Sequence, residues 1–280
     1  MKQSVIKAGP YSLSYDKRTL VMGILNVTPD SFSDGGKYNQ VEQAVEHAKK
    51  LVRDGADMID IGGESTRPRA KYVSAEEELS RLIPVIEILH RELNVPISVD
   101  TYKAEVARKS ILAGAHIIND IWGAMKDPEM ARVAAELDVP IVLMHNRQDA
   151  RYDSLMDDIC EDLLAMVRNV KQAGVKDENI ILDPGIGFAK NYEENLTVMR
   201  HLERITELGY PVLLGTSRKS MIGHTLGLPT DDRLEGTAAT VALGIVKGCR
   251  IVRVHDVKEM SRVCRMMDAM LYGVSNKEAD

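Results

Sequence analysis

Amide and ionisable side chains recur at one kind of position in this sequence, the carboxyl end of a short apolar run. In chain order the residues at these ends are Asn26, Asp60, Asp100, Asn119 with Asp120, Met144 with His145, Asp183, and Arg253 with His255 and Asp256. A buried nitrogen heterocycle needs paired donors and acceptors, because each unpaired polar group costs ~1–3 kcal/mol. Asp100, Asn119 and Asp183 therefore predict a pocket for a planar heterocycle. Apolar and aromatic faces for the ring are available from Ile121, Met144 and Phe188.

Several of these acids have a structural explanation as helix caps. An aspartate at the end of a strand often caps the helix that follows it. For Asp100 the two interpretations weigh about equally, because a helical pattern begins immediately after it. The capping interpretation is stronger for Asp120, Asp127 and Asp256, which we leave out of the candidate site. Asp60 is also left out, because its side chain could point inward or support other residues.

The segment "DPGIGF" (183–188) is harder to explain as a plain turn. Asp183 ends an apolar run, the next residues carry little side-chain bulk, and Phe188 is then presented over the opening. A structural turn needs neither the acid nor the Gly-x-Gly. The pattern is not GxGxxG, so it predicts no dinucleotide site.

A candidate anion site follows the last two apolar runs. The segment "GTSRKS" (215–220) supplies Lys219, and Arg253 and His255 lie on the next run. Loops after the seventh and eighth strands of a barrel commonly bind phosphate. Arg253 sits in an otherwise apolar run, so a solvated charge explains it poorly. We therefore predict a diphosphate site formed by Asn26, Arg253 and His255. The side-chain oxygen of Asn26 suits Mg²⁺ there. Lys219 can donate a hydrogen bond to a ring carbonyl.

The elements that position these residues form a repeat of apolar run and helical segment. The runs lie at 20–27, 57–63, 95–101, 115–121, 139–145, 179–185, 210–217 and 250–257. The helical segments between and after them lie at 41–56, 75–93, 103–115, 128–138, 155–174, 191–209, 233–248 and 258–273. Continuous apolar runs are typical of parallel strands covered on both faces. Eight even units favour an α/β fold, a (β/α)8 TIM barrel, over an open doubly wound sheet.

We expect a single domain over 1–280, since no linker or compositional break interrupts the repeat. Residues 1–19 are predicted to form a short N-terminal β-hairpin that covers the bottom of the barrel. The barrel itself is expected over 20–273, followed by a tail at 274–280. Several predicted helices end in Gly just before a strand, which is the chemistry of a helix C-cap.

Composition excludes several classes of protein. The net charge of -6 over 280 residues argues against nucleic acid as a partner. No apolar stretch is long enough to span a membrane and the first residues lack a signal peptide, so we expect a cytoplasmic protein with no membrane partner. The three cysteines have no paired spacing, which predicts free thiols. His145 and His255 lack the HxH or HExxH pattern of a zinc site.

Seven motifs, in order along the whole chain, make it resemble the bacterial dihydropteroate synthase family of pterin-binding enzymes. They are "GILNVTPDSFSDGG", "DIGGESTRP", "SVDT", "INDI", "DPGIGF", "GTSRKS" and "VHDV". The resemblance implies that 6-hydroxymethyl-7,8-dihydropterin diphosphate joins p-aminobenzoate, giving 7,8-dihydropteroate and diphosphate with Mg²⁺. It also implies a homodimer that pairs through the late helices. The implied pterin contacts are Asp100, Asn119, Ile121, Met144, Asp183, Phe188, Lys219 and Arg253.

The resemblance also implies roles for two loops, at 28–36 and 64–70, which would close over the site. Glycines at 35 and 36 let the first loop move. Its Asp30 and Asp34 would meet the metal and diphosphate. The implied p-aminobenzoate pocket consists of Phe32, Thr66, Arg67, Pro68, Lys219 and Ser220.

The chemistry we expect is a dissociative substitution carried by Asp183, Lys219, Arg253 and Asn26. Diphosphate leaves the exocyclic methylene, and Asp183 stabilises the resulting pterin cation electrostatically. A concerted displacement is the competing hypothesis. The aryl amine is already nucleophilic, so no strong base is required.

Three other functions remain open at this point. A methyltetrahydrofolate–corrinoid methyltransferase uses a similar barrel and pocket, but lacks the "TPDSFSDGG" and "SRKS" segments. A non-catalytic pterin-binding paralogue would not need Asn26, Lys219, Arg253 and both loops. A phosphosugar isomerase or Schiff-base aldolase needs an inward lysine on a strand, whereas Lys219 is expected in a loop.

Overall fold

Eight parallel strands form the centre of the protein in its computed structural model, which describes residues 4–28, 37–65 and 72–273. They are β3 (Leu20–Asn26), β4 (Met58–Gly62), β5 (Ile97–Asp100), β6 (Ile117–Asp120), β7 (Ile141–Met144), β8 (Ile180–Asp183), β9 (Leu213–Leu214) and β10 (Ile251–Val254). They pair in the order β8-β7-β6-β5-β4-β3-β10-β9. A bridge between Leu182 and Val212 joins the two ends of this order. The sheet is therefore a closed barrel, as predicted, and not an open doubly wound sheet.

The continuous apolar pattern of the strands is explained by their burial. The barrel interior covers one face of each strand and the helices cover the other, so both faces are removed from water. Six of the seven residues of β3 and all four residues of β8 are buried. Strand β9 has two residues, fewer than the apolar run at 210–217 that predicted it.

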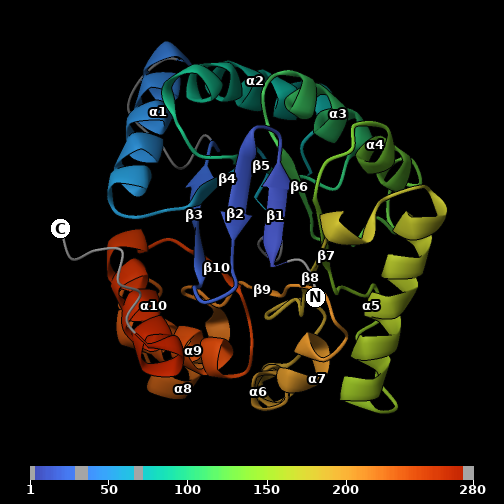
Figure 1. Ribbon diagram of the computed structural model, residues 1–280, viewed down its shortest axis with the longest axis vertical. Helices are drawn as coiled ribbons and strands as arrows, with labels where there is room; N and C mark the ends of the chain where they lie inside the picture. The colour runs from blue at the N-terminus through green and yellow to red at the C-terminus, as the bar shows by residue number, and fades with distance from the viewer. Residues whose placement is uncertain (1–3, 29–36, 66–71, 274–280) are drawn as a thin grey trace.

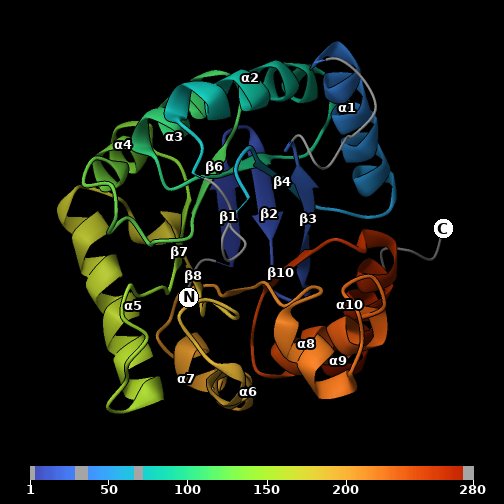
Figure 2. The ribbon, with the colours of Figure 1, turned by 180° about the vertical axis from the view of Figure 1, so that it is seen from behind.

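The helices form a ring around the strands, which Figure 1 and Figure 2 show from opposite sides. They are α1 (Lys37–Arg53), α2 (Ala75–Glu92), α3 (Ala104–Leu112), α4 (Met130–Glu136), α5 (Leu155–Gln172), α6 (Tyr192–Arg200), α7 (Glu203–Thr206), α8 (Ser220–Leu226), α9 (Leu234–Val246) and α10 (Val257–Tyr272), with a short 3-10 turn at Asp177–Asn179. The helix expected over 191–209 is divided into α6 and α7. Helix α8 was not predicted, because its seven residues are too few for a periodic pattern.

The helix ends agree with the predicted glycine caps. Gly55, Gly114 and Gly209 follow helices and have φ angles of 108°, 117° and 96°. Gly114 shows why no other residue fits, because a Cβ there would lie 2.5 Å from the His90 side chain. These left-handed residues turn the chain from a helix into the next strand.

The N-terminal hairpin closes one end of the barrel, as predicted. Strands β1 (Val5–Ala8) and β2 (Tyr11–Ser14) pair antiparallel, and they cross the middle of the ring in Figure 1. Ile6 and Ala8 pack against residues at the amino ends of the barrel strands, among them Leu20, Met58 and Ile117. The opposite end, where the strands terminate, is left for a site. No described helix meets the length and hydrophobicity that a membrane span requires.

Candidate active site

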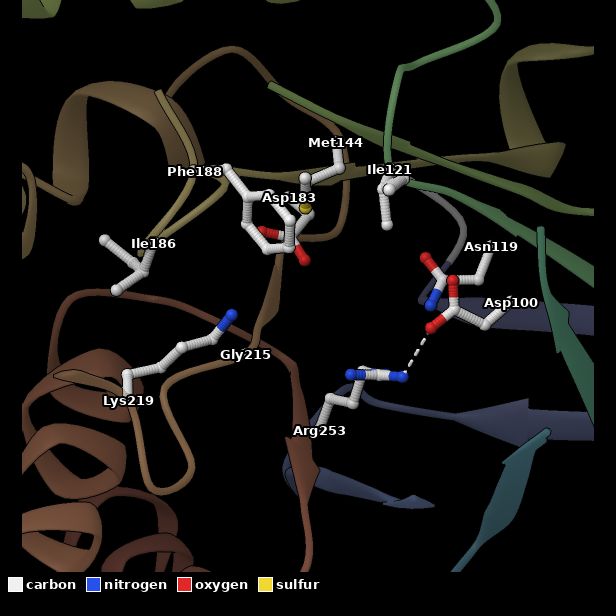
Figure 3. Close-up of a pocket in the computed structure, with 10 residues that line it drawn as sticks. All are labelled: Asp100, Asn119, Ile121, Met144, Asp183, Ile186, Phe188, Gly215, Lys219 and Arg253. Carbon is white, nitrogen blue, oxygen red and sulfur yellow. Dashed lines mark hydrogen bonds and ion pairs between the residues drawn. The ribbon is translucent and has the colours of Figure 1, made fainter. Parts of the chain in front are cut away.

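A pocket lies at the carboxyl ends of the barrel strands, with about 390 Å³ of empty space that includes its opening to solvent. Figure 3 shows its side chains converging from several strands and loops on one space. The lining residues are Asp100, Asn119, Ile121, Met144, Asp183, Ile186, Phe188, Gly215, Lys219 and Arg253. All the residues predicted to surround a heterocycle are in this set. Ile186 and Gly215 were not predicted. Ile186 is apolar and Gly215 has no side chain, and the prediction used mainly the polar residues of their motifs.

Arg253 crosses the barrel interior from β10 and binds two carboxylates. Its Nε lies 2.6 Å from Asp60 Oδ2, and its Nη2 lies 2.7 Å from Asp100 Oδ2. Burial lowers the pKa of Arg253, but Asp60 and Asp100 outweigh that effect and raise it above its usual value. The guanidinium is therefore a fixed positive charge on the floor of the cavity.

Asp60 is a functional residue that the sequence analysis left out. It is fully buried in the middle of β4, and its Oδ2 accepts hydrogen bonds from Arg253 and, at 3.0 Å, from Asn119 Nδ2. It thereby fixes the orientation of two residues that line the cavity. A signal was present in the sequence, because Ile59 and Ile61 flank the acid and an ionised carboxylate buried in a strand needs a cation.

Two buried carboxylate oxygens around Arg253 receive no hydrogen bond from the described residues. Asp60 Oδ1 and Asp100 Oδ1 are buried and have no hydrogen-bond partner among the described residues. Burial raises the pKa of Asp100 to about 7, against the opposing effect of Arg253. Near neutral pH the Asp100 carboxyl can therefore either accept or donate a hydrogen bond, which suits a heterocycle that carries both ring N–H groups and ring nitrogen acceptors.

The loop after β8 brings Asp183 and Phe188 to the same cavity. The Gly185 N–H donates to Asp183 Oδ1 over 2.7 Å. Gly185 has a φ of 67°, and a Cβ there would lie 1.9 Å from the His145 carbonyl oxygen. Only glycine fits this turn. Burial raises the pKa of Asp183, while the Gly185 hydrogen bond and the charges of Lys219 and Arg253 lower it.

Lys219 enters the cavity from the loop between β9 and α8. Its Nζ lies 4.4 Å from the centre of the Phe188 ring, a cation–π distance. Burial and the charge of Arg253 lower its pKa to about 8, although Asp183 and Asp100 act in the opposite direction. Arg233 holds the loop by donating to the carbonyl oxygens of Arg218 and Lys219, at 2.9 and 3.2 Å.

The acids expected to cap the following helix have structural roles, but not that one. Asp120 accepts from the Trp122 and Ala124 N–H groups within a turn, and Asp127 accepts from the first N–H of the preceding helix α3. The following helix, α4, begins after Glu129 and has no side-chain cap. Asp256 was wrongly expected to cap α10 with its side chain. It instead binds Arg218, whose Nε lies 3.0 Å away. Asp100 does not cap α3, whose N-cap residue is Lys103.

The residues predicted for the diphosphate lie at neighbouring strand ends. Asn26 is the last residue of β3 and is exposed, and His255 directly follows β10. These two strands pair in parallel, with Val254 opposite Gly23. The Nδ1 atom of His255 lies 3.0 Å from Ser217 Oγ. Asn26 and His255 do not line the cavity itself, so they are placed beside the pocket that Arg253 lines.

Residues predicted on the two loops cannot be placed. Six of them lie outside the described residues. They are Asp30, Phe32 and Asp34 on one loop, and Thr66, Arg67 and Pro68 on the other. Ser220 is described, and it begins α8 immediately after Lys219. The p-aminobenzoate pocket therefore stays a prediction, and of its residues only Lys219 and Ser220 are described.

A closed parallel barrel with a polar, heterocycle-sized cavity at the carboxyl ends of its strands belongs to the class of (β/α)8 enzymes. The family model described as "Pterin binding enzyme" matches residues 22–255, so the chain belongs to the pterin-binding enzyme family. Its functional motifs all lie within or at the limits of that match.

Similar proteins within the family are dihydropteroate synthases. The dihydropteroate synthase of Bacillus subtilis is 63% identical over 267 residues, covering 95% of this chain and 94% of the relative. The Clostridium difficile enzyme, crystallised in the presence of pteroic acid, has a TM-score of 0.91, 51% identity, and coverage of 92% and 99%. The Xanthomonas albilineans enzyme in complex with 7,8-dihydropteroate has a TM-score of 0.88, 39% identity, and coverage of 96% and 99%.

Proposed function

We propose that this protein condenses 6-hydroxymethyl-7,8-dihydropterin diphosphate with p-aminobenzoate, forming 7,8-dihydropteroate and diphosphate. One observation carries the proposal: Asp100, Asn119 and Asp183 face one cavity together with Lys219 and Arg253. The reaction itself is inferred from the resemblance to dihydropteroate synthases that carry these motifs. Both the similar sequences and the similar solved structures are named for that activity.

The pterin ring is the part of the substrate that the described residues suit best. Asp183 and Asn119 offer an acceptor and an amide to its N–H groups and ring nitrogens. Lys219 offers a donor to the ring carbonyl. Met144 and Phe188 cover the ring faces. The polar residues thus give the ring's polar groups hydrogen-bond partners, while these two side chains remove its faces from water.

The diphosphate is proposed to bind beside the ring, at Asn26, Arg253 and His255. Two nitrogens of Arg253 bind carboxylates, and its Nη1 has no protein partner among the described residues. That nitrogen is free to bind an oxyanion. Arg253 thus links the pterin pocket to the leaving-group pocket.

The Mg²⁺ that the family implies is proposed to arrive with the diphosphate. The Asn26 side chain offers one hard oxygen, and Mg²⁺ is commonly held by one or two protein oxygens together with substrate phosphates. No group of three His, Cys, Asp or Glu side chains is arranged to hold a metal in the described part of the chain. These residues fit a substrate-borne ion better than a resident one. When bound, Mg²⁺ neutralises charge on the leaving diphosphate.

Substitution is proposed to pass through a pterin cation. As the bond between methylene carbon and diphosphate oxygen breaks, positive charge spreads into the dihydropterin ring. The buried Asp183 carboxylate, fixed by Gly185, lies where it stabilises that charge. The amine of p-aminobenzoate then attacks the methylene carbon, and its proton leaves to diphosphate or solvent. Phe32, Thr66, Arg67, Pro68 and Ser220 are proposed to hold the amine, with Asp30 and Asp34 near the metal.

The methyltransferase and the non-catalytic paralogue are not favoured by the comparisons, since the similar curated proteins are dihydropteroate synthases. One assay separates all three possibilities. The purified protein is incubated with pterin diphosphate, p-aminobenzoate and Mg²⁺, and both diphosphate and dihydropteroate are measured. Equal amounts of the two products support the proposal. A methyl transfer to a corrinoid, or pterin binding without product, would contradict it.

We further propose that two copies associate through α9 and α10, which pack side by side in Figures 1 and 2. Large apolar side chains are exposed on these two helices. They are Leu234, Leu243 and Val246 on α9, and Met266, Met270 and Leu271 on α10. Large exposed apolar side chains on two adjacent helices are typical of a protein interface, and a symmetric homodimer covers them with the same helices of a second copy.

A single charge on this face is expected to produce monomers. Val246→Glu or Met270→Glu places a carboxylate in the apolar interface, where its desolvation opposes pairing. Sedimentation velocity of the wild type is expected to give twice the chain mass of 31.1 kDa, and of each variant the chain mass. Leu112→Glu, on the exposed face of α3, is the control and should remain a dimer. A wild-type monomer, or dimers for both variants, would refute the proposed interface.

A further inference from the structure

Lys190 lies directly behind the loop that presents Phe188, and the proposed reaction gives it no role. It follows the "DPGIGF" segment by two residues and is partly buried. Its Nζ donates to the carbonyl oxygens of Gly185 and Phe188, each 3.1 Å away, and lies 2.9 Å from His145 Nδ1. A lysine ammonium has three N–H donors and no acceptor. All three donors therefore have a partner.

These contacts continue into a chain of buried polar groups. His145 is fully buried, and its Nε2 lies 3.0 Å from Asp162 Oδ2. Asp162 also accepts from Arg147 Nε at 2.6 Å. While Lys190 is charged it can only donate, so His145 Nδ1 accepts and the imidazole proton is on Nε2. Burial, helped by the charge of Lys190, lowers the pKa of His145 to about 3, so the ring stays neutral.

We propose that Lys190 is a positioning residue for the reaction. It fixes the loop that carries Phe188, and its positive charge adds to those that favour the ionised Asp183 carboxylate. The proposal rests on the proposed function, because it assumes that Asp183 binds the pterin ring. It assigns His145, Asp162 and Arg147 the task of holding Lys190 in place.

The loop needs support from outside because its backbone is unusual. Gly185 and Gly187 have φ angles of 67° and 84°, and Ala189 has a φ of 47°. A left-handed conformation at a residue other than glycine costs of order 1–3 kcal/mol and persists only where the surroundings hold it. Lys190 binds the carbonyl groups on both sides of Gly187, and Tyr152 Oη donates to the Ala189 carbonyl over 2.7 Å. Phe188 is thus fixed at its position over the cavity.

Several charged groups face Lys190 and affect its pKa. Burial lowers its pKa to about 7; Asp183 and Glu194 act to raise it, and Lys219 and Arg147 act to lower it further. In return, the charges of Lys219, Arg253 and Lys190 lower the pKa of Asp183 against its burial. Below about pH 7 Lys190 is charged and supports the Asp183 carboxylate. As the pH rises through that value, both the charge and one N–H donor are lost.

The test compares Lys190→Met and Lys190→Arg with the wild type by the pH dependence of kcat/KM for the pterin diphosphate. The Met variant removes the charge, so the pKa of Asp183 rises and the acid limb moves upward by about one pH unit. Its KM for the pterin rises about tenfold, because Phe188 loses its position. The Arg variant stays charged at all pH values, so its acid limb stays in place, and its basic limb moves upward from a pKa near 7 to that of Lys219, about 8. Lys247→Met, which removes a lysine paired with Glu203 on the surface, is the control.

Two further measurements keep the outcome interpretable. Circular dichroism verifies folding; if Lys190→Met is unfolded, the Lys190→Arg profile alone decides the matter. The dissociation constant of pteroic acid gives a binding readout independent of turnover. An acid limb of Lys190→Met that coincides with the wild type, or moves equally in Lys247→Met, overturns the proposal. An unchanged basic limb in Lys190→Arg does so as well. A wild type that forms no dihydropteroate contradicts the proposed function instead, which separates the two failures.

Discussion

Replacing Asp183 with asparagine is expected to lower kcat about 10²–10³-fold. The substitution keeps the size of the side chain and one oxygen that accepts from the Gly185 N–H at 2.7 Å, so the turn after β8 is preserved. What it removes is the negative charge, which in our account stabilises the pterin cation and accepts from the ring N–H groups. Steady-state kinetics with both substrates measures the effect, and the KM for p-aminobenzoate should change little.

Asp138→Asn is the matched control for this substitution. Asp138 has a left-handed backbone, with a φ of 50°, which asparagine tolerates. It lies between α4 and β7, away from the cavity, and binds Asn179. Its replacement should leave kcat unchanged. Wild-type turnover by Asp183→Asn would remove this carboxylate from the chemistry.

Replacing Arg253 with lysine is expected to lower kcat/KM for the pterin diphosphate about a hundredfold, roughly 2.7 kcal/mol. Arg253 binds Asp60 through Nε and Asp100 through Nη2, and its Nη1 carries an additional pair of donors that the proposal assigns to the diphosphate. A single ammonium cannot reproduce this rigid fork. One of the two buried carboxylates then loses its cation, so the pKa of Asp100, already about 7 through burial, rises further.

The pH dependence gives this prediction a second readout. In the wild type the Arg253 charge opposes the effect of burial on Asp100, so the removal of the fork shifts the ionisation of Asp100 to higher pH. The pH profile of pterin binding should move in the same direction. Arg250→Lys, at the amino end of the same strand and in contact with Tyr272, is the control and should behave like the wild type. Equal losses in the two variants would show a structural effect and not a role in the site.

The barrel was predictable because its signal is repeated. Each parallel strand is buried on both faces, so each appears as a continuous apolar run, and eight such runs alternate with amphipathic segments. Glycine caps such as Gly114 marked the turns. Helix α8 was missed because seven residues span only two turns, and the segment reads as part of the loop that holds Lys219. The division between α6 and α7 was missed for a similar reason, since amphipathic periodicity continues across the break.

The pocket was predictable because closure of a parallel barrel brings all strand ends to one rim. This geometry places Asp100, Asn119 and Asp183 together although they are far apart in the sequence. Asp60 was missed because its role depends on Arg253, 193 residues later, and no local pattern reveals that pair. Lys190 was missed likewise, because its partner His145 lies on a separate loop and its own neighbours resemble an ordinary helix start.

The most direct test of the central claim is a crystal structure of this protein with pteroic acid. Our account predicts that the pterin ring lies in the cavity beneath Phe188, with Asp183 and Asn119 within hydrogen-bond distance of its nitrogens. Lys219 should lie beside the ring carbonyl. A ring bound elsewhere on the protein, or one that leaves Asp183 without a contact, would contradict the account.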